Sequence, residues 1–453
     1  METKDVISTK HIDVLDGIRA ISVIIVLIFH FWQQTWIFPV IKTPFLGFMG
    51  VERLDFTPLA RVGYLFVDMM ILISGFLLFL PVARNVFYGE PLENRSVFFK
   101  KRAIRILPSY LICILLLFVY ELINGGYGRP IVWGTAISDL ILHLTFMQTW
   151  TTQSYLSTKL NVVLWTLAVE VWFYILFPVI SGFIKRRKTE NSPAKPIFRA
   201  CVVFALMVLI SAAYIYGYVL NSGSAFSKSV DGFLTGIRIG YMQVGIRSDY
   251  LSMVINQLPA FMGLYAVGII GSLIYVFAAG KLKRKWWIGL IFTATAILFI
   301  WLIARMIKDC SLKSAEDAQI WQMTERLKLA FVFMGFILSS AFAAKPYRFL
   351  LSNKLMVFLS TISYNLYIWH QWLCVKLKYD WHIPYWTGEK PPNQLYDPAS
   401  EVWKAKYAVI ITVGAFLLAT IMTYLFERPM SDLLNKRPSI YNGKLRTLFK
   451  KNK

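Results

Sequence analysis

The stretch LDGIRAISVIIVLIFHFW, from Leu15 to Trp32, decides the fold class of this chain. A helix of about 20 mainly apolar residues is long enough to cross the hydrocarbon core of a bilayer. Asp16 and Arg19 interrupt its start and no small-residue cleavage site follows, so we expect a retained span rather than a cleaved signal peptide. Across the whole chain 57% of residues are hydrophobic and only 16% are charged. Soluble domains have about a quarter of their residues charged, so this composition excludes an ordinary one.

Apolar windows of similar length recur along the 453 residues and predict an all-α, polytopic membrane protein. We expect ten spans, at 14–34, 62–82, 106–123, 163–183, 200–220, 254–278, 287–304, 327–344, 355–375 and 407–426. The apolar stretch 136–150 is too short to cross and contains Asp139 and His143, so we expect a re-entrant or interfacial helix there. We expect a single integral membrane domain over 1–453, with a basic tail at 427–453 and no additional soluble domain.

Lysine and arginine set the expected orientation. With both termini cytoplasmic, the inner segments hold 29 of these residues in 97 positions. The outer segments, 35–61, 124–162, 221–253, 305–326 and 376–406, hold 17 in 152 positions. The positive-inside rule favours this arrangement, which explains the net charge of +23 by contact with membrane lipids and without a nucleic-acid partner. The four cysteines form no CxxC pair and suit no metal site, so we expect free thiols and no metal.

Ionisable residues inside a span are costly and therefore mark candidate functional sites. In the first span Arg19 and His30 are 11 residues apart, which in an α-helix is three turns plus about 20°. Both side chains therefore lie on one helix face, about 16 Å apart along the axis. Snorkelling of Arg19 to the headgroups and a packing role for His30 are the plainer alternative. The shared face favours a joint functional role.

Polar side chains in other spans fall at depths comparable to that of His30. Asp68 and Glu170 each lie about two turns below the outer end of their span, so either carboxylate is a candidate partner for His30. A carboxylate that accepts a hydrogen bond from one imidazole nitrogen fixes the tautomer and raises the basicity of the other nitrogen. The candidate substrate-binding residues, near the outer end of the ninth span, are His370, Tyr364 and Tyr367. For Glu170 and His370 a structural hydrogen bond between helices is an equally good explanation.

On the inner side, the segment KKRAIR (Lys100 to Arg105) leads into the third span. Arg102 and Arg105 are three residues apart and are therefore neighbours on one helix face. Two guanidiniums at a helix start can bind a phosphate group, while positive-inside topology is the plainer alternative.

Six segments, in chain order, resemble the motifs of the membrane acyltransferase family 3, whose members are integral membrane O-acyltransferases. The segments are LDGIRAISVIIVLIFHF, FVDMMILISGFLLF, RAIRILPSYL, LWTLAVEVWFYILFP, ISYNLYIWH and YLFERP, and they run from about Val14 to Pro429. The positions that match the family's conserved pattern are Arg19, His30, Arg102, Arg105, Trp165, Leu167 and Glu170. Asp68, and Val171 with Trp172 after Glu170, depart from that pattern.

The resemblance implies transfer of an acyl group, acetyl first, from cytoplasmic acyl-CoA to a hydroxyl of a glycan or other cell-surface acceptor. Arg102 and Arg105 would hold the nucleotide phosphates and Arg19 the donor arm. His30 would be the general base or a transient acyl carrier, with Glu170 or Asp68 orienting it or holding the acceptor. A flippase for a glycan intermediate and a non-catalytic membrane subunit are the alternatives from other functional classes.

Overall fold

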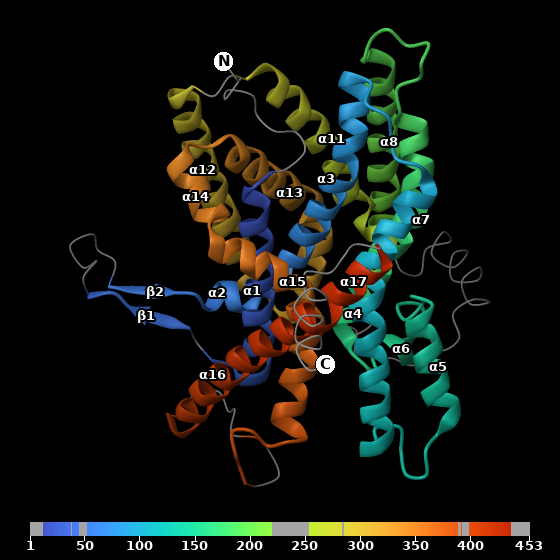
Figure 1. Ribbon diagram of the computed structural model, residues 1–453. Coiled ribbons are helices and arrows are strands. Elements are labelled where there is room, and N and C mark those ends of the chain that lie inside the picture. The colour runs from blue at the N-terminus through green and yellow to red at the C-terminus, as the bar shows by residue number, and fades with distance from the viewer. Residues whose placement is uncertain are drawn as a thin grey trace, which may run out of the picture.

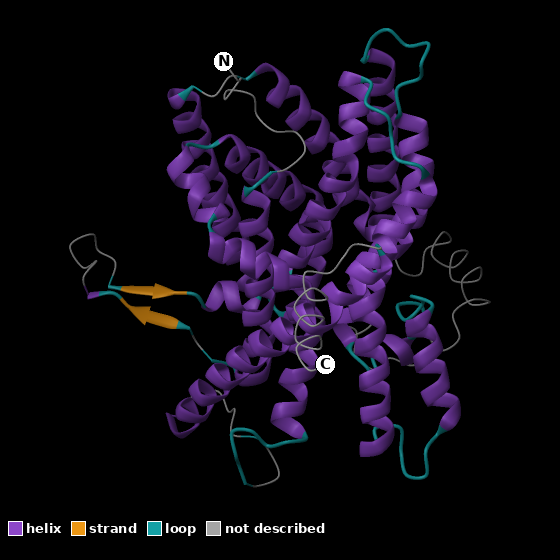
Figure 2. Cartoon of the chain, viewed as in Figure 1, coloured by secondary structure: helices purple, strands orange, loops and turns teal. Residues whose placement is uncertain are grey.

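The computed structural model describes residues 12–37, 39–44, 52–219, 253–282, 285–387, 391 and 398–435. In this part of the chain almost all regular structure is helical (Figure 2). The exception is a short hairpin of β1 (Val40–Lys42) and β2 (Arg53–Asp55), which pair antiparallel with Ile41 opposite Leu54. Residues 221–252 of the predicted outer segment 221–253, and residues 436–453 of the predicted tail 427–453, lie outside the described residues.

Long helices lie at all ten positions where the hydropathy predicts a span. They are α1 (Val14–Thr35), α3 (Leu65–Tyr88), α4 (Arg95–Asn124), α7 (Trp165–Ile184), α8 (Ala194–Ala212), α11 (Leu258–Lys281), α12 (Trp286–Ser311), α13 (Ala315–Phe342), α15 (Lys354–Tyr379) and α16 (Pro398–Ile421). Two of them continue as π-helical turns, α8 into η3 (Ala213–Val219) and α16 into η4 (Met422–Glu427), and α17 (Arg428–Leu434) follows η4. The short helices between them are α2 (Thr57–Arg61), α5 (Trp133–Leu144), α6 (Thr152–Tyr155), η2 (Val162–Leu164) and α14 (Lys345–Ser352).

Length and apolarity identify fewer of these helices as spans than the sequence predicts. Among the described residues eight helices qualify alone, and nine if α13 is joined to α14 across a 113° bend. The apolar run of α13 follows a charged first half that includes Arg326 and Lys328, and α15 carries polar residues along its length. The predicted short helix is present as α5, whose 12 residues extend only about 18 Å.

The helices on both sides of one predicted outer loop are longer than the predicted spans. The segment 305–326, expected outside the membrane, is almost entirely helical, because α12 runs to Ser311 and α13 starts at Ala315. Arg326, counted there as an outer-loop cation, is buried with 2% of its surface exposed. The charged residues of this segment suggested an exposed loop, but Arg326 belongs to a buried ion pair that is described below.

The centre of the bundle is formed by α3 and α11, which pack along each other (Figure 1). In the most apolar stretches of α3 and α11, 78% and 83% of the residues are buried. The corresponding shares are 17% for α12 and 22% for α8, which lie at the periphery. Gly268 on α11 lies against the backbone of α3, where an added Cβ would be 2.8 Å from the Phe76 nitrogen. On another side α1 packs along α15.

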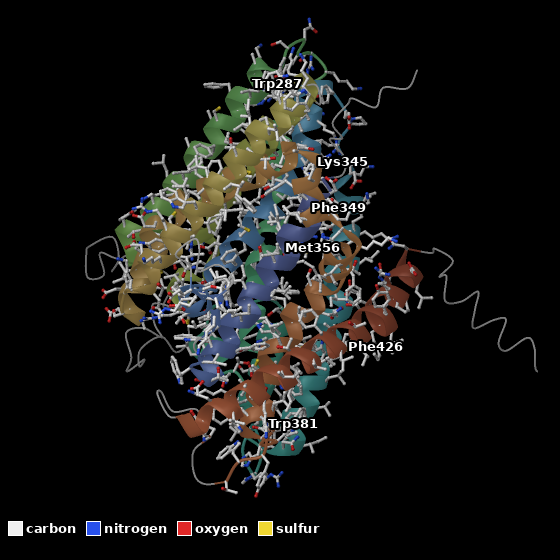
Figure 3. All side chains as sticks on the ribbon, turned by 90° about the vertical axis from the view of Figure 1, so that its left-hand side faces the viewer. Trp287, Lys345, Phe349, Met356, Trp381 and Phe426 are labelled. Atoms are coloured by element: carbon white, nitrogen blue, oxygen red, sulfur yellow. The ribbon has the colours of Figure 1, made fainter. Side chains whose placement is uncertain are left out.

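The connections between the helices lie at two opposite ends of the bundle. The α3–α4 and α7–α8 loops are together at the top of Figure 1, and the α4–α5 loop is at the bottom. In the rotated view Trp287 and Lys345 lie toward one end and Trp381 lies at the other (Figure 3). This alternation is the one that the span assignment predicts, and the assignment of one end to the cytoplasm stays a prediction from charge.

Candidate active site

The packing of α1 on α15 brings two histidines into contact. His370 Nε2 lies 2.9 Å from His30 Nδ1, and the ring centroids are 4.8 Å apart. His30 Nδ1 is also 3.0 Å from the carbonyl oxygen of Val26, and His370 Nδ1 is 3.0 Å from that of Leu366. His370 has no exposed surface, whereas His30 is only partly buried. The imidazole that the sequence singles out is therefore partly exposed and lies in contact with a second, buried imidazole.

Asp68 is bound by side chains of α13. Its Oδ2 accepts hydrogen bonds from Arg326 Nε at 3.2 Å and from Gln322 Nε2 at 3.3 Å, and both charged side chains are at most 2% exposed. Arg326 also donates to the carbonyl oxygens of Ile255 and Ala260, at 3.1 and 3.4 Å. Asp68 thus binds a cation on α13, and the expected contact with His30 is not among the hydrogen bonds of the described residues.

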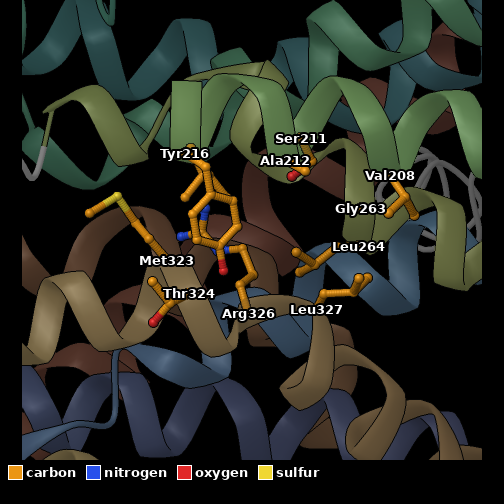
Figure 4. A pocket seen from close by; sticks show the side chains of 11 residues that line it. Val208, Ser211, Ala212, Tyr216, Gly263, Leu264, Met323, Thr324, Arg326 and Leu327 are labelled. Carbon is orange, nitrogen blue, oxygen red and sulfur yellow. The ribbon is translucent and has the colours of Figure 1, made fainter. Parts of the chain in front are cut away.

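Arg326 borders a small cavity between α8, α11 and α13. The cavity has a volume of about 110 Å³, and Figure 4 shows Arg326 beside Tyr216 and Met323 in its lining. The Nη2 atom of Arg326 is buried and has no hydrogen-bond partner within the described part of the chain. This cavity is too small for a glycan or an acyl donor.

Glu170 belongs to an inner cluster around Arg19. The Tyr174 hydroxyl donates a hydrogen bond to Glu170, and Arg19 interacts electrostatically with Glu170, Arg105 and Tyr174. Arg19 lies about 16 Å from His30 along α1. Glu170 is therefore placed with the guanidiniums rather than with the imidazole. The sequence left the carboxylate partner of His30 open, and the structure puts His370 in that position.

Arg102 and Arg105 face different surroundings. The Arg102 guanidinium lies 5.5 Å from the ring centres of both Phe98 and Tyr174, and its Nε is buried with no partner among the described residues. Arg105 is exposed and interacts electrostatically with Arg19. Both guanidiniums also interact electrostatically with Tyr174, and a joint phosphate site of the two side chains stays a prediction.

Arg102 lines a cavity of about 310 Å³ between α3, α4 and α7. Two further cations, Arg95 and Lys185, line the same cavity, with apolar walls from Phe98 and Phe177. The acid Glu93 also lines it and forms an ion pair with Lys101. Three cations around one opening suit a polyanionic group such as a phosphate ester. Neither Arg19 nor His30 is among its lining residues, so the cavity accounts for the inner part of the expected donor path only.

The loop after α7 holds Lys185 beside this cavity. Arg199 donates to both carboxylate oxygens of Glu190, at 2.7 and 2.9 Å, and to the Lys185 carbonyl at 2.8 Å. The hydrogen bonds from Arg199 to the Glu190 carboxylate, together with one from the Arg187 backbone, lower the pKa of Glu190 from its usual 4.5 to about 2. Asn85 at the end of α3 accepts from the Arg186 backbone, at 2.8 Å, and fixes the loop to the bundle.

A family model described as an acyltransferase domain matches residues 12–428, which is nearly the whole chain and includes every candidate site residue described above. The chain belongs to acyltransferase family 3. Within the described residues no three His, Cys, Asp or Glu side chains are grouped so that they could hold a metal ion.

Individual relatives carry acetyltransferase names. A protein of Acidianus two-tailed virus that is named as an acetyltransferase is 26% identical over 333 residues, 72% of this chain and 78% of the viral one. The O-acetyltransferase OatA of Staphylococcus aureus is 25% identical over 227 residues, 46% of this chain and 32% of OatA. A second S. aureus protein, named as an O-acetyltransferase, is 22% identical over 80% of this chain and 50% of its own length. The alignments thus span a third to a half of the staphylococcal proteins. No solved structure matches the chain.

The family match makes this chain a multi-pass membrane enzyme of the acyltransferase class. Its two candidate substrate-binding tyrosines are used in contacts between helices. The Tyr364 hydroxyl donates to the Ile106 carbonyl on α4 at 2.9 Å, and the Tyr367 hydroxyl donates to the Val163 carbonyl at 3.3 Å. Because both hydroxyl protons are used in these contacts, the two tyrosines could contact a substrate through their aromatic faces but not by donating these protons.

The segment YLFERP contains an acidic residue, Glu427, for which no role is predicted from the sequence. Glu427 ends the π-helical turn η4, and its Oε2 accepts hydrogen bonds from Asn365 on α15 and from Ser109 on α4. It also interacts electrostatically with Arg105. A π-turn shifts the register of the residues that follow and is often found at functional sites. The resemblance of this motif to the family was the signal in the sequence for Glu427, but only the fold shows which residues Glu427 contacts.

Proposed function

We propose that this enzyme transfers an acyl group, acetyl as the first candidate, from cytoplasmic acyl-CoA to a hydroxyl of an extracytoplasmic glycan or other cell-surface acceptor. The observation that carries the proposal is a series of polar groups that runs from a cavity between α3, α4 and α7 to His30 on α1. A cation-lined cavity with Arg102 lies at one end of the bundle, Arg19 and Arg105 follow, and a partly exposed His30 lies about 16 Å further on.

The inner residues would bind and orient the donor. Arg102, with Arg95 and Lys185, would hold the phosphates of the nucleotide, because guanidinium groups form the strongest charge-assisted hydrogen bonds with phosphate oxygens. Arg105 is exposed and Arg19 and Glu170 are partly so, although they lie on helices with largely buried faces. A passage for the thin pantetheine arm beside Arg19 is part of this proposal.

His30 would carry out the proton transfer at the thioester. In the direct route its Nε2 takes the proton of the acceptor hydroxyl while the hydroxyl oxygen attacks the thioester carbon. The carbon–sulfur bond then breaks, and the leaving thiolate takes up the proton from Nε2. In the alternative route Nε2 itself attacks the thioester carbon, and the carbon–sulfur bond breaks to leave the acyl group on Nε2 and a CoA thiolate. The acceptor hydroxyl oxygen then attacks the acyl carbon, the carbon–nitrogen bond breaks, and the hydroxyl proton passes to the thiolate. Both routes need an unprotonated Nε2 on a neutral His30.

The test is His30→Ala in the full-length protein, reconstituted in vesicles with acetyl-CoA and a hydroxyl-bearing glycan acceptor. We expect loss of acyl transfer by a factor of about 10²–10⁴, the usual contribution of a general acid–base residue. Gln33→Ala, at an exposed position on the same helix, is the matched control and should keep activity. Acyl transfer at the wild-type rate by His30→Ala would refute the proposal.

Mass spectrometry of surface glycans from cells with and without the active enzyme identifies the acyl group and the acceptor together. A mass difference of one acyl group that also disappears with His30→Ala is the expected result. Movement of the glycan across the vesicle membrane without consumption of acyl-CoA would instead favour a flippase.

A further inference from the structure

The contacts of the two histidines fix where their protons lie. Three contacts of 2.9 to 3.0 Å join His30 Nδ1 to Val26 O, His370 Nδ1 to Leu366 O, and His30 Nδ1 to His370 Nε2. A carbonyl oxygen can only accept, so each contact with a carbonyl requires a proton on the Nδ1 atom. Two Nδ1–H groups satisfy all three contacts, because His30 Nδ1–H is then shared between Val26 O and the lone pair of His370 Nε2.

The other neutral assignments leave lone pairs facing each other. If His370 carried its proton on Nε2, its Nδ1 lone pair would lie 3.0 Å from the Leu366 carbonyl oxygen. Donation from that Nε2 to His30 would place a second lone pair against Val26 O. Protonating both rings fully would bury two like charges in contact, which is more costly still.

We propose that His370 is a positioning residue that holds His30 in the Nδ1–H tautomer and so leaves its Nε2 free to act as the base or acyl carrier. This inference rests on the proposed function of His30. His370 is suited to the task, because it is fully buried and anchored through Nδ1 to its own helix. It supplies the acceptor that an Asp supplies in hydrolase triads, but as a neutral group.

The same contact also serves the charged intermediate. When Nε2 of His30 takes a proton or an acyl group, the ring becomes cationic and its Nδ1–H becomes a stronger donor. The lone pair of His370 Nε2, 2.9 Å away, is then in place to stabilise that charge. Because no carboxylate is among the partners of His30 in the described structure, His370 is the side chain that performs this role.

Substitutions of His370 that keep or remove a hydrogen-bond acceptor near the position of Nε2 test the proposal. His370→Gln can place an amide oxygen near the position of Nε2 and keep an acceptor for His30, whereas His370→Phe keeps the ring shape without one. We expect His370→Phe to lower kcat about 10- to 100-fold, the usual effect of removing a group that orients a reacting side chain, with the KM for acyl-CoA unchanged. His370→Gln should recover most of the loss.

His370→Asn keeps the assay decisive if the phenylalanine variant fails to fold. Asn can reproduce the Nδ1 donor but places nothing at Nε2, so its kcat should fall as in His370→Phe. Wild-type kcat in these variants, equal impairment of His370→Gln, or a change confined to KM would overturn the inference. If these results accompany an inactive His30→Ala, only the role of His370 fails. If His30→Ala stays active, the proposed function fails first.

The tautomer can also be read directly. In protein with ¹⁵N-labelled histidine, the signals of His30 are those that vanish in His30→Ala. We expect a protonated Nδ1 and an unprotonated Nε2 for neutral His30 in the wild type. A proton on Nε2 of the neutral ring would overturn the assignment.

Discussion

The ion pair between Asp68 and Arg326 gives a sharp prediction for stability. The Asp68 carboxylate and the Arg326 guanidinium are at most 2% exposed, and Arg326 also stacks on Phe261, 4.2 Å from the ring centre. Asp68→Asn keeps the shape of the side chain but leaves the buried guanidinium without its counter-charge. Removing one partner of a buried pair costs about 3–5 kcal/mol. We therefore expect the free energy of unfolding of Asp68→Asn to fall by about that amount.

Removing both charges should cost less than removing one. In the double variant Asp68→Asn with Arg326→Met no unpaired charge remains, and the main loss is the donor to the Ile255 and Ala260 carbonyls, about 1–3 kcal/mol. The double variant should therefore be about 2 kcal/mol more stable than Asp68→Asn, roughly a 30-fold difference in the unfolding constant. This order separates a charge effect from simple loss of packing.

Denaturant-induced unfolding in detergent micelles, followed by tryptophan fluorescence, measures the three stabilities. The matched control is Glu325→Gln, which breaks the exposed pair with Lys328, whose side chains are 34% and 70% exposed. An exposed pair of this kind contributes about 0.2–0.5 kcal/mol, so the control should match the wild type. Wild-type stability of Asp68→Asn, or a double variant less stable than the single one, would contradict the reasoning.

Two further variants probe the inner cavity and the bundle centre. Arg102→Ala should raise the KM for acyl-CoA at least tenfold through loss of a charged hydrogen bond of about 1.5–3 kcal/mol. The exposed neighbour Lys100→Ala is the control and should leave the KM unchanged. An unaltered KM in Arg102→Ala would exclude Arg102 from donor binding. Gly268→Ala should lower the free energy of unfolding by about 1–3 kcal/mol, because the new Cβ meets the backbone of α3 at Phe76 and backbone cannot yield as a side chain does. Gly134→Ala, which meets nothing within 4 Å, is its control, and equal stability of the two variants would argue against the close contact.

The sequence predicts the fold class well because a membrane span is a local property. Each span needs about 20 apolar residues in succession, and that pattern is visible without knowing which helices touch. The prediction is weaker where a helix owes its position to neighbours. The polar residues of α15 and the charged first half of α13 are compensated by partners far away in sequence, so their hydropathy understates their burial.

The composition of the candidate site could be predicted, but its pairings could not. The 11-residue spacing of Arg19 and His30 is visible in the sequence because it follows from the geometry of one helix. The contact between His30 and His370 spans 340 residues, and the contact between Asp68 and Arg326 spans 258. Nothing local marks such partners. The similar depths of Asp68, Glu170 and His30 in their spans suggested a carboxylate partner for His30, whereas in the fold its partner is the imidazole of His370.

Burial cost gives a physical reason for that choice of partner. A carboxylate held against His30 would place a full negative charge inside the bundle while the histidine is neutral, and an isolated buried charge costs several kcal/mol. Asp68 avoids this cost by binding Arg326, and Glu170 does so by lying close to Arg19. The pair of His30 and His370 carries no net charge in the resting state. It therefore costs less to bury, yet it still provides a lone pair when the reaction makes His30 cationic. A neutral acceptor stabilises that cation less than a carboxylate would, which keeps Nε2 a weaker base and favours return of the proton to the leaving thiolate.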